Sequence, residues 1–339
     1  MNSINSKIKR RYPWIDYMKV LGMYFIIYGH FFSLGNKYVY TFSVALFFMI
    51  SGLLTKKTKN YTLFWSKTWY NLVVPMLIIC CCLFVWRTQS DIRHHTFKID
   101  SLYLFPLQLI MGYYNSLQIM WFVYTLIIIK IIHEYTPSKQ HFLLLFLMCI
   151  AGITYNKTIH FSSIQENEQY ANAIINVTTA YPFFAIGNLL YSKKEIIDEY
   201  SNLLGEILIF LVSLVIIYLC GTYNEKVLMY LNDYGNNYSL FLIGGIAGTV
   251  LTLIASKWLC RFDIKIIKIL STGSIVTLGF HMIFVTYTRS IFATPSLLDL
   301  LLSGLILLLF VPIIIFFEKH FPLVVGKYRF KNNLGKQSS

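Results

Sequence analysis

Charged residues are scarce in this sequence. Only 13 % of the 339 residues are Asp, Glu, Lys or Arg, whereas a soluble domain averages about 25 %, and 56 % are hydrophobic. This balance excludes an ordinary soluble domain and predicts an all-α polytopic membrane protein. Nucleic-acid binding is not expected despite the net charge of +14, because the basic residues form short clusters beside apolar runs, the pattern of cytoplasmic membrane loops.

Paired cysteines and a cleavable leader are also missing. The six cysteines fall in or at the edges of apolar runs, with neither CxxC spacing nor a disulfide framework. The basic segment 7–11 leads directly into the first apolar run without a small-residue cleavage site, so no signal peptide is expected. His94 and His95 are adjacent in a polar loop without a third ligand nearby, so no metal site is predicted.

Ten apolar stretches are present, and we interpret each as a membrane-spanning helix. They are 17–34, 38–54, 69–86, 117–132, 141–155, 173–191, 204–220, 239–256, 272–288 and 297–317. The stretch 102–111 is too short to cross a bilayer and is expected to form an interfacial or re-entrant helix. Pro75 predicts a kink in the third span, and Ser51-Gly52 predicts close helix packing in the second.

The basic residues orient these ten spans. On this topology 21 of the 29 lysines and arginines fall on the side of the two termini, 7 fall on the opposite side, and Lys19 lies within the first helix. The positive-inside rule therefore predicts that both termini are cytoplasmic. The expected organisation is a basic N-terminus (1–12), a single transmembrane domain (13–320) and a basic tail (321–339).

The first span contains three ionisable residues, Asp16, Lys19 and His30. Such groups cost about 2.5–3.5 kcal/mol each inside a membrane and tend to be kept for function. Helical steps of about 100° per residue put the three on one face, and 11 residues separate Lys19 from His30 by about 16 Å. Lys19 and His30 are therefore expected to mark two points along one path. The alternative is that Asp16 and Lys19 only snorkel to the interface and that His30 is only a packing residue.

The ninth span contains a second histidine, His281, seven residues after Ser274 and on the same helical face. A polar stripe of this kind can simply join helices within lipid. Two distant spans each contain one histidine, however, and a shared polar cavity would satisfy both. A basic group near the cytosol with histidines deeper in the membrane suits a long substrate with an anionic head and a reactive far end, as in acyl-coenzyme A.

Several motifs occur in the order typical of one enzyme family. They are Asp16, Lys19 and His30 in the first span, Phe47-Phe48-Met49-Ile50-Ser51-Gly52-Leu53 in the second, Met120-Trp121-Phe122-Val123, Pro182-Phe183-Phe184-Ala185-Ile186-Gly187, and Gly273-Ser274 followed by His281. Over residues 13 to 290 the chain resembles the acyltransferase 3 family of integral membrane acyltransferases, and most closely its fucose 4-O-acetylase-like branch.

The chain departs from that family at two positions. The basic residue of the first motif is Lys19 instead of the commoner arginine, so it cannot form a bidentate fork with phosphate. Family members often carry arginines at the start of the third span, where this chain has Lys67, Trp69 and Asn71. The sequence therefore assigns no second basic contact there.

The resemblance implies an O-acetyltransferase of the bacterial cytoplasmic membrane. Such enzymes move an acetyl or other acyl group from acetyl-CoA, without a metal, to a hydroxyl of O-antigen, capsule, exopolysaccharide, peptidoglycan or a lipid-linked precursor. The alternative is a transporter or flippase of a lipid-linked saccharide, which would also be polytopic with buried polar residues.

Each conspicuous polar residue has an expected role. We predict that His30 is the general base, and that His281 orients the acceptor or stabilises the oxyanion; a transient acyl-histidine is a further route. Lys19 is expected to hold the donor, and Asp16 to pair with Lys19. Ser274 could cap the second nitrogen of His281. Three more residues are expected to support the site, namely Trp121, Ser51 and Asn188.

Overall fold

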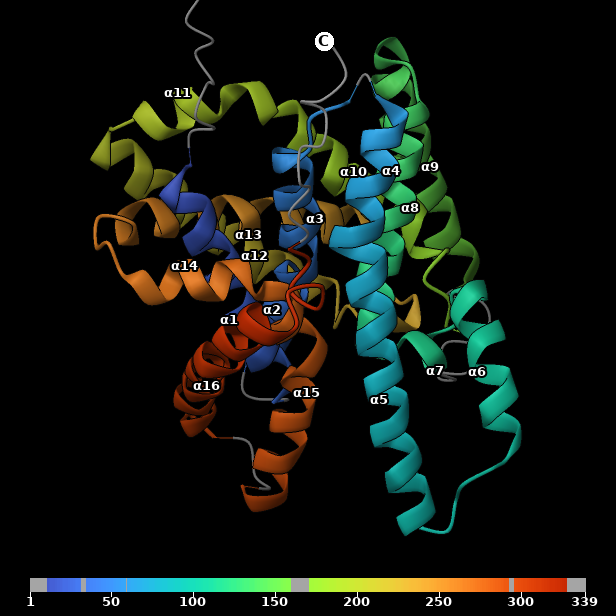
Figure 1. Cartoon of the computed structure of the whole chain (residues 1–339). Coiled ribbons are helices and arrows are strands. Elements are labelled where there is room, and N and C mark those ends of the chain that lie inside the picture. The colour runs from blue at the N-terminus through green and yellow to red at the C-terminus, as the bar shows by residue number, and fades with distance from the viewer. Residues whose placement is uncertain (1–10, 32–34, 59, 160–170, 293–295, 328–339) are drawn as a thin grey trace, which may run out of the picture.

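The protein is a bundle of helices, as predicted. The computed structural model describes residues 11–31, 35–58, 60–159, 171–292 and 296–327 (Figure 1). Within these ranges there is no β-strand, only two isolated bridges. The helices are α1 (Pro13–His30), α2 (Asn36–Tyr40), α3 (Ser43–Leu54), α4 (Tyr61–Thr68), α5 (Val74–Arg93), α6 (Asp100–Met111), α7 (Tyr114–Leu117), α8 (Trp121–Tyr135), α9 (His141–Ile159), α10 (Asn176–Leu189), α11 (Lys194–Glu199), α12 (Leu203–Tyr223), α13 (Tyr238–Leu259), α14 (Lys265–Thr272), α15 (Ser274–Ile291) and α16 (Leu298–His320).

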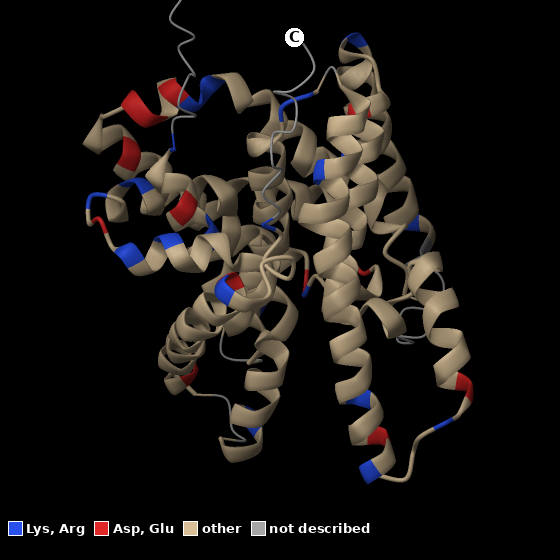
Figure 2. Ribbon diagram, in the orientation of Figure 1, with Lys and Arg blue, Asp and Glu red and all other residues tan. Residues whose placement is uncertain are grey.

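The all-α polytopic class is confirmed, but the count of ten spans is not. Seven helices in the described parts of the chain are long and apolar enough to cross a membrane, or eight if the bent pair α14–α15 counts as one span. Figure 2 shows long uncharged stretches along α9 and α16, whose charged residues lie near the helix ends. Two predicted spans are not among these helices. One is α10, which has only 14 residues, and the other is α1, which carries three ionisable side chains in 18 residues.

Helix α1 lies at the centre of the bundle. It packs against α3, α13, α14, α15 and α16, so its polar face is enclosed by protein on most sides. This enclosure explains how a helix of modest hydropathy is accommodated, because ionisable groups in a membrane are tolerated where they face the bundle interior or a cavity. The largest fully buried side chain of the protein, Trp14, stands at its start.

Helices α4 and α5 form one 33-residue run with a π-helical turn, Trp69–Val73, just before Pro75. Pro75 lacks the N–H that would bond the carbonyl four residues earlier, and the wider turn absorbs this loss. At the position of the predicted kink, the helix therefore contains a π-helical turn. The short helix expected around 102–111 is α6, and its Phe105 stacks on Phe84 near the middle of α5.

Glycines allow α3 and α10 to touch through their backbones, as Ser51-Gly52 predicted. A Cβ on Gly52 would overlap the carbonyl oxygen of Phe184, and a Cβ on Gly187 would overlap that of Met49. Asn188 secures the same contact, because its side chain donates to the carbonyls of Gly52 (3.2 Å) and Thr55 (2.7 Å). Without a hydrophobic force between helices in lipid, such close backbone packing supplies much of the association.

Replacing Gly52 by alanine is expected to separate these two helices and to lower stability by about 1–3 kcal/mol or more. The change is measured as the thermal midpoint of the detergent-purified protein. Gly304→Ala is the matched control, because the nearest atom to its added Cβ lies 4.0 Å away. Equal midpoints for the two variants would contradict the backbone contact.

Candidate active site

A basic chamber of about 530 Å³ opens between α1, α3, the π-helical turn Trp69–Val73, α8, α14, α15 and the segment after α16. Among the described residues that line it, four are cationic, namely Arg11, Lys19, Lys130 and Lys327, and one is acidic, Asp16. Arg11 pairs with Asp16 and Lys327 with Glu318, whereas Lys19 and Lys130 have no ion-pair partner among the described residues, and this surplus of positive charge favours an anionic ligand. Arg11 and Lys327 stand near opposite ends of the described chain, so the two ends meet at this chamber.

The start of α15 adds to the positive field. An 85° bend between α14 and α15 at Gly273 puts the first two residues of α15, Ser274 and Ile275, on the chamber wall. The N-terminus of a helix carries a partial positive charge, which favours anions. The chamber is therefore suited to phosphate groups.

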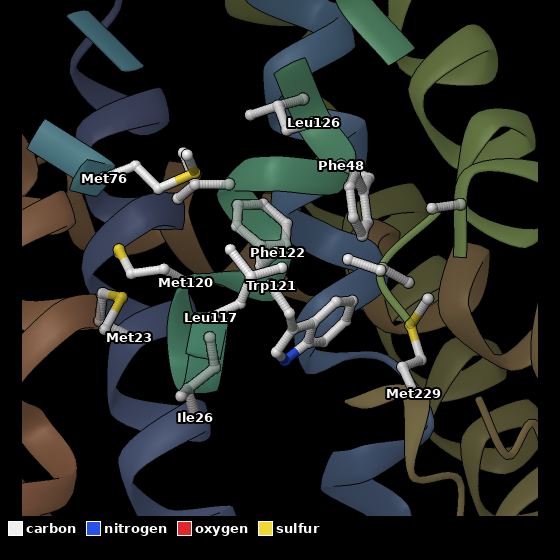
Figure 3. Packing of buried hydrophobic residues seen from close by; sticks show 14 of the residues in the cluster. Met23, Ile26, Phe48, Met76, Leu117, Met120, Trp121, Phe122, Leu126 and Met229 are labelled. Carbon is white, nitrogen blue, oxygen red and sulfur yellow. The ribbon is translucent and has the colours of Figure 1, made fainter. Parts of the chain in front are cut away.

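One face of α1 connects this chamber with a smaller one. Asp16, Lys19 and Met23 line the basic chamber, and Ile26 and His30 line the smaller one. The spacing of three and four residues is that of a single helical stripe, as the sequence predicted. Figure 3 shows Met23 and Ile26 following each other along α1, next to the segment that carries Trp121 and Phe122.

The smaller space, which we call the histidine chamber, has a volume of about 50 Å³. His30 and His281 both line it, and their ring centroids are 5.1 Å apart with the planes tilted by 47°. The cavity shared by two histidines is thus present. Three residues, Phe47, Phe122 and Leu278, line both chambers and form the boundary between them.

The hydrogen bonds of His281 define its tautomer. Nδ1 lies 2.8 Å from the carbonyl oxygen of Leu278 and 3.2 Å from that of Thr277, and a carbonyl can only accept. Nδ1 therefore carries the hydrogen, and Nε2 of the neutral ring holds the lone pair. Nε2 is buried and has no hydrogen-bond partner among the described residues. His281 is thus equipped to accept a proton or a hydrogen bond from a bound molecule.

Two predicted contacts differ from those observed. Asp16 and Lys19 form no direct ion pair among the described contacts, although the Asp16 charge still acts on Lys19 at longer range; the carboxylate accepts from Arg11 Nε (2.6 Å) and from Ser271 Oγ (2.6 Å). Ser274 does not cap His281, because it lies on the wall of the basic chamber while the ring of His281 bonds within its own helix. Both predictions assumed that partners one or two turns away on the same helix would meet, whereas a neighbouring helix or the backbone supplied nearer groups.

The predicted supporting residues take different positions. Trp121 lines the histidine chamber, and Ser51 lines the basic chamber. Asn188 touches neither chamber and instead holds the end of α3 through the two carbonyls described above. Its contribution is therefore structural.

A side chamber of about 290 Å³ adjoins the basic chamber, and Lys130 and Asn71 line both. Lys56 and Lys67 line only the side chamber. Lys67, near the start of the third span, thus lines a chamber beside the site, although the sequence alone assigned no basic contact there. Lys130, whose Nζ donates to Thr55 Oγ1 (3.0 Å), was missed as a site residue. The signal was available, because Lys130 is a lone lysine within an apolar span, as Lys19 is.

No metal centre is found in the parts of the chain that the structure describes, where no three His, Cys, Asp or Glu residues are grouped suitably for a metal ion. His94 and His95 lie at the end of α5 on the exposed surface. The polar groups that line the chambers are cations, amides, hydroxyls, imidazoles, the Trp121 indole and the carboxylates of Asp16 and Glu134.

Comparison with known proteins gives one match. A family model described as an acyltransferase domain matches residues 12–317, which include α1 and nearly all of α16. No curated protein and no solved structure matches the chain. The matched range contains both histidines and two of the four cations of the basic chamber, Lys19 and Lys130, but not Arg11 or Lys327.

Proposed function

The chain belongs to the acyltransferase 3 family and is a membrane acyltransferase, and on this premise we propose that acetyl-CoA is its donor and a carbohydrate hydroxyl its acceptor. The acceptor is a bacterial surface glycan, such as O-antigen, capsule or exopolysaccharide, or its lipid-linked precursor. The enzyme then resides in the bacterial cytoplasmic membrane, in keeping with its multiple apolar helices. Within the family, the fucose 4-O-acetylase-like branch remains our proposal.

The observation that carries the proposal is the passage from a cationic chamber to a chamber with two histidines. The phosphates of coenzyme A would lie among Lys19, Lys130 and Arg11, where the positive charge gathers. The pantetheine arm would pass between Phe47, Phe122 and Leu278, which line both chambers. The thioester would then reach His30 and His281, about 16 Å along α1 from Lys19.

The reaction requires one proton transfer in each direction. A sugar hydroxyl is a weak nucleophile, so an imidazole removes its proton while the new carbon–oxygen bond forms. The carbon–sulfur bond of the thioester then breaks, and the imidazolium returns the proton to the coenzyme A thiolate. The products are one ester and one thiol, and no oxidant or metal is consumed.

We assign the base role to His30 and a supporting role to His281. With its lone pair on Nε2, neutral His281 can accept a hydrogen bond but cannot donate one to an oxyanion from that nitrogen. Of the two roles that the sequence left open, orienting the acceptor is therefore favoured over stabilising the oxyanion. His281 accepts a hydrogen bond either from the hydroxyl of the acceptor sugar or from His30, whose ring centroid lies 5.1 Å from its own.

The proposal predicts that membranes containing the protein transfer radiolabel from [¹⁴C-acetyl]CoA to glycan. The label should be released by mild alkali, because an O-acetyl ester is alkali-labile. Membranes with the His30→Ala variant, matched for protein level, are the control. A flippase would move the saccharide without labelling it, so glycan that crosses the membrane unlabelled by the wild-type protein would overturn the proposed function.

A further inference from the structure

The two chambers differ about tenfold in volume. The basic chamber measures about 530 Å³, whereas the histidine chamber measures about 50 Å³. The larger space can receive the bulky part of a donor, while only a small group fits beside the two imidazoles. The size of the histidine chamber therefore bears directly on which acyl group reaches the reacting atoms.

The walls of the histidine chamber come from five helical segments. Apart from the two histidines and the boundary residues Phe47, Phe122 and Leu278, the lining residues are Ile26 from α1, Val44 from α3, Ile119 from the 3₁₀ turn Gln118–Met120, and Trp121 from α8. All are apolar except for the Trp121 indole nitrogen. The chamber therefore suits an acyl group without charge, and it excludes a succinyl-type carboxylate, which would be buried without a cation on the wall.

These walls are held by packing from behind. Phe48 and Met120 are fully buried next to them in the same hydrophobic cluster as Ile26 and Trp121 (Figure 3). Gln118 has a positive φ of 45°, an unusual conformation for a side chain other than glycine, at the point where Ile119 and Trp121 turn toward the chamber. Close-packed wall side chains of this kind do not move easily to make room for extra acyl atoms.

The volume can be compared with the groups that must react. One water-sized group needs about 10–15 Å³, so the chamber holds about four such groups. An acetyl group has three non-hydrogen atoms, and the attacking hydroxyl oxygen adds a fourth, whereas a butyryl group with the same oxygen needs about six. The chamber thus accommodates an acetyl group and its nucleophile without spare room.

We infer that the histidine chamber selects the acyl group by length, and that Ile26, Val44 and Ile119 set the limit at acetyl, with propionyl poorly accepted. This inference rests on the proposed function, since it assumes that an acyl-CoA donor places its thioester beside His30 and His281. It assigns specificity to apolar residues that take no part in proton transfer.

Purified protein or membranes would be assayed with acetyl-, propionyl- and butyryl-CoA in turn, and free coenzyme A release would be measured with a thiol reagent. One surplus methylene in a tight site costs about 10–200-fold in kcat/KM, so butyryl-CoA should be at least about tenfold poorer than acetyl-CoA. Transfer of butyryl at the acetyl rate by the wild-type protein would overturn the inference while leaving the proposed function intact.

The Val44→Ala variant removes two methyl groups from the wall and should narrow the acetyl-to-butyryl ratio of kcat/KM by about fivefold or more. Val285→Ala is the control for the same substitution, because Val285 is a buried valine on α15 that lines neither chamber. Should Val44→Ala fold poorly, Ile119→Val removes a single methylene and tests the same wall. An equal ratio in the chamber variants and in Val285→Ala would contradict the assignment of these residues.

The outcomes separate the two proposals. No coenzyme A release with any acyl-CoA, in the presence of glycan acceptor, would remove the donor assignment itself. Release with acetyl-CoA but without discrimination by length would remove only the size limit. If selectivity for the short acyl group weakens in Val44→Ala and is unchanged in Val285→Ala, both the proposed function and the size limit are supported.

Discussion

Replacing His30 by alanine is expected to lower acyl transfer by about 10²–10⁴-fold, the usual contribution of a positioned general base. His30 is the ionisable residue of α1 that reaches the histidine chamber, where its ring faces that of His281. The measurement is the initial rate of label transfer from acetyl-CoA in membranes with equal amounts of protein. Near-normal acetylation by His30→Ala would remove the base assignment.

Glutamine variants distinguish the roles of the two histidines. A glutamine at position 281 keeps a carbonyl oxygen that can accept a hydrogen bond, as Nε2 of His281 does, but it cannot carry a proton away. His281→Gln should therefore retain far more activity than His281→Ala, whereas His30→Gln should be as impaired as His30→Ala. If both glutamine variants lose activity equally, both imidazoles take part in proton transfer. His94→Ala, on the exposed end of α5, serves as the control for histidine replacement elsewhere.

The second large effect concerns Lys19. Removing its charge with Lys19→Met should raise the KM for acetyl-CoA by about 10–150-fold with little change in kcat, because a charge-assisted hydrogen bond contributes about 1.5–3 kcal/mol. Methionine keeps the apolar stem, so the packing of α1 is preserved. The measurement is the dependence of the transfer rate on acetyl-CoA concentration at low and high salt.

Two further variants make the Lys19 result interpretable. Lys19→Arg should retain most of the activity, since charge and not fork geometry is what the basic chamber requires. Lys139→Met removes a lysine from the exposed turn Ser138–Gln140, away from the chambers, and should leave the KM unchanged. A Lys19→Met variant with unchanged KM and reduced kcat would instead place Lys19 in the chemical step.

The sequence was most informative where an inference concerned a single helix. The face shared by Asp16, Lys19 and His30 follows from helical geometry alone, and the structure extends it through Met23 and Ile26 as one stripe along two chambers. The same local reasoning found Ser51-Gly52, because small residues permit close approach whatever the partner helix is. The helical repeat is a property of a single segment, so it is unchanged when the helices pack together.

Inferences between segments were less complete. The break at Gly273 lies inside the predicted ninth span, which began at residue 272 and was expected to be continuous. A Cβ at Gly273 would overlap the side chain of Ile314 of α16, and only the packed bundle reveals that close approach at the break. The convergence of Arg11, Lys130 and Lys327 on the basic chamber likewise depends on which helices become neighbours.

By itself, the sequence determined that this is an all-α membrane protein, that its family resemblance is to acyltransferases, and that one face of the first helix bears a cation and a histidine on a common path. These features depend on composition and on the 3.6-residue repeat, which every helix obeys locally. Only the tertiary structure decided that His281 meets His30, that Asp16 binds Arg11 and Ser271, and that the chamber beside the histidines is small. The reason is physical: a contact between helices is selected by the packing of the entire bundle, which no single segment encodes.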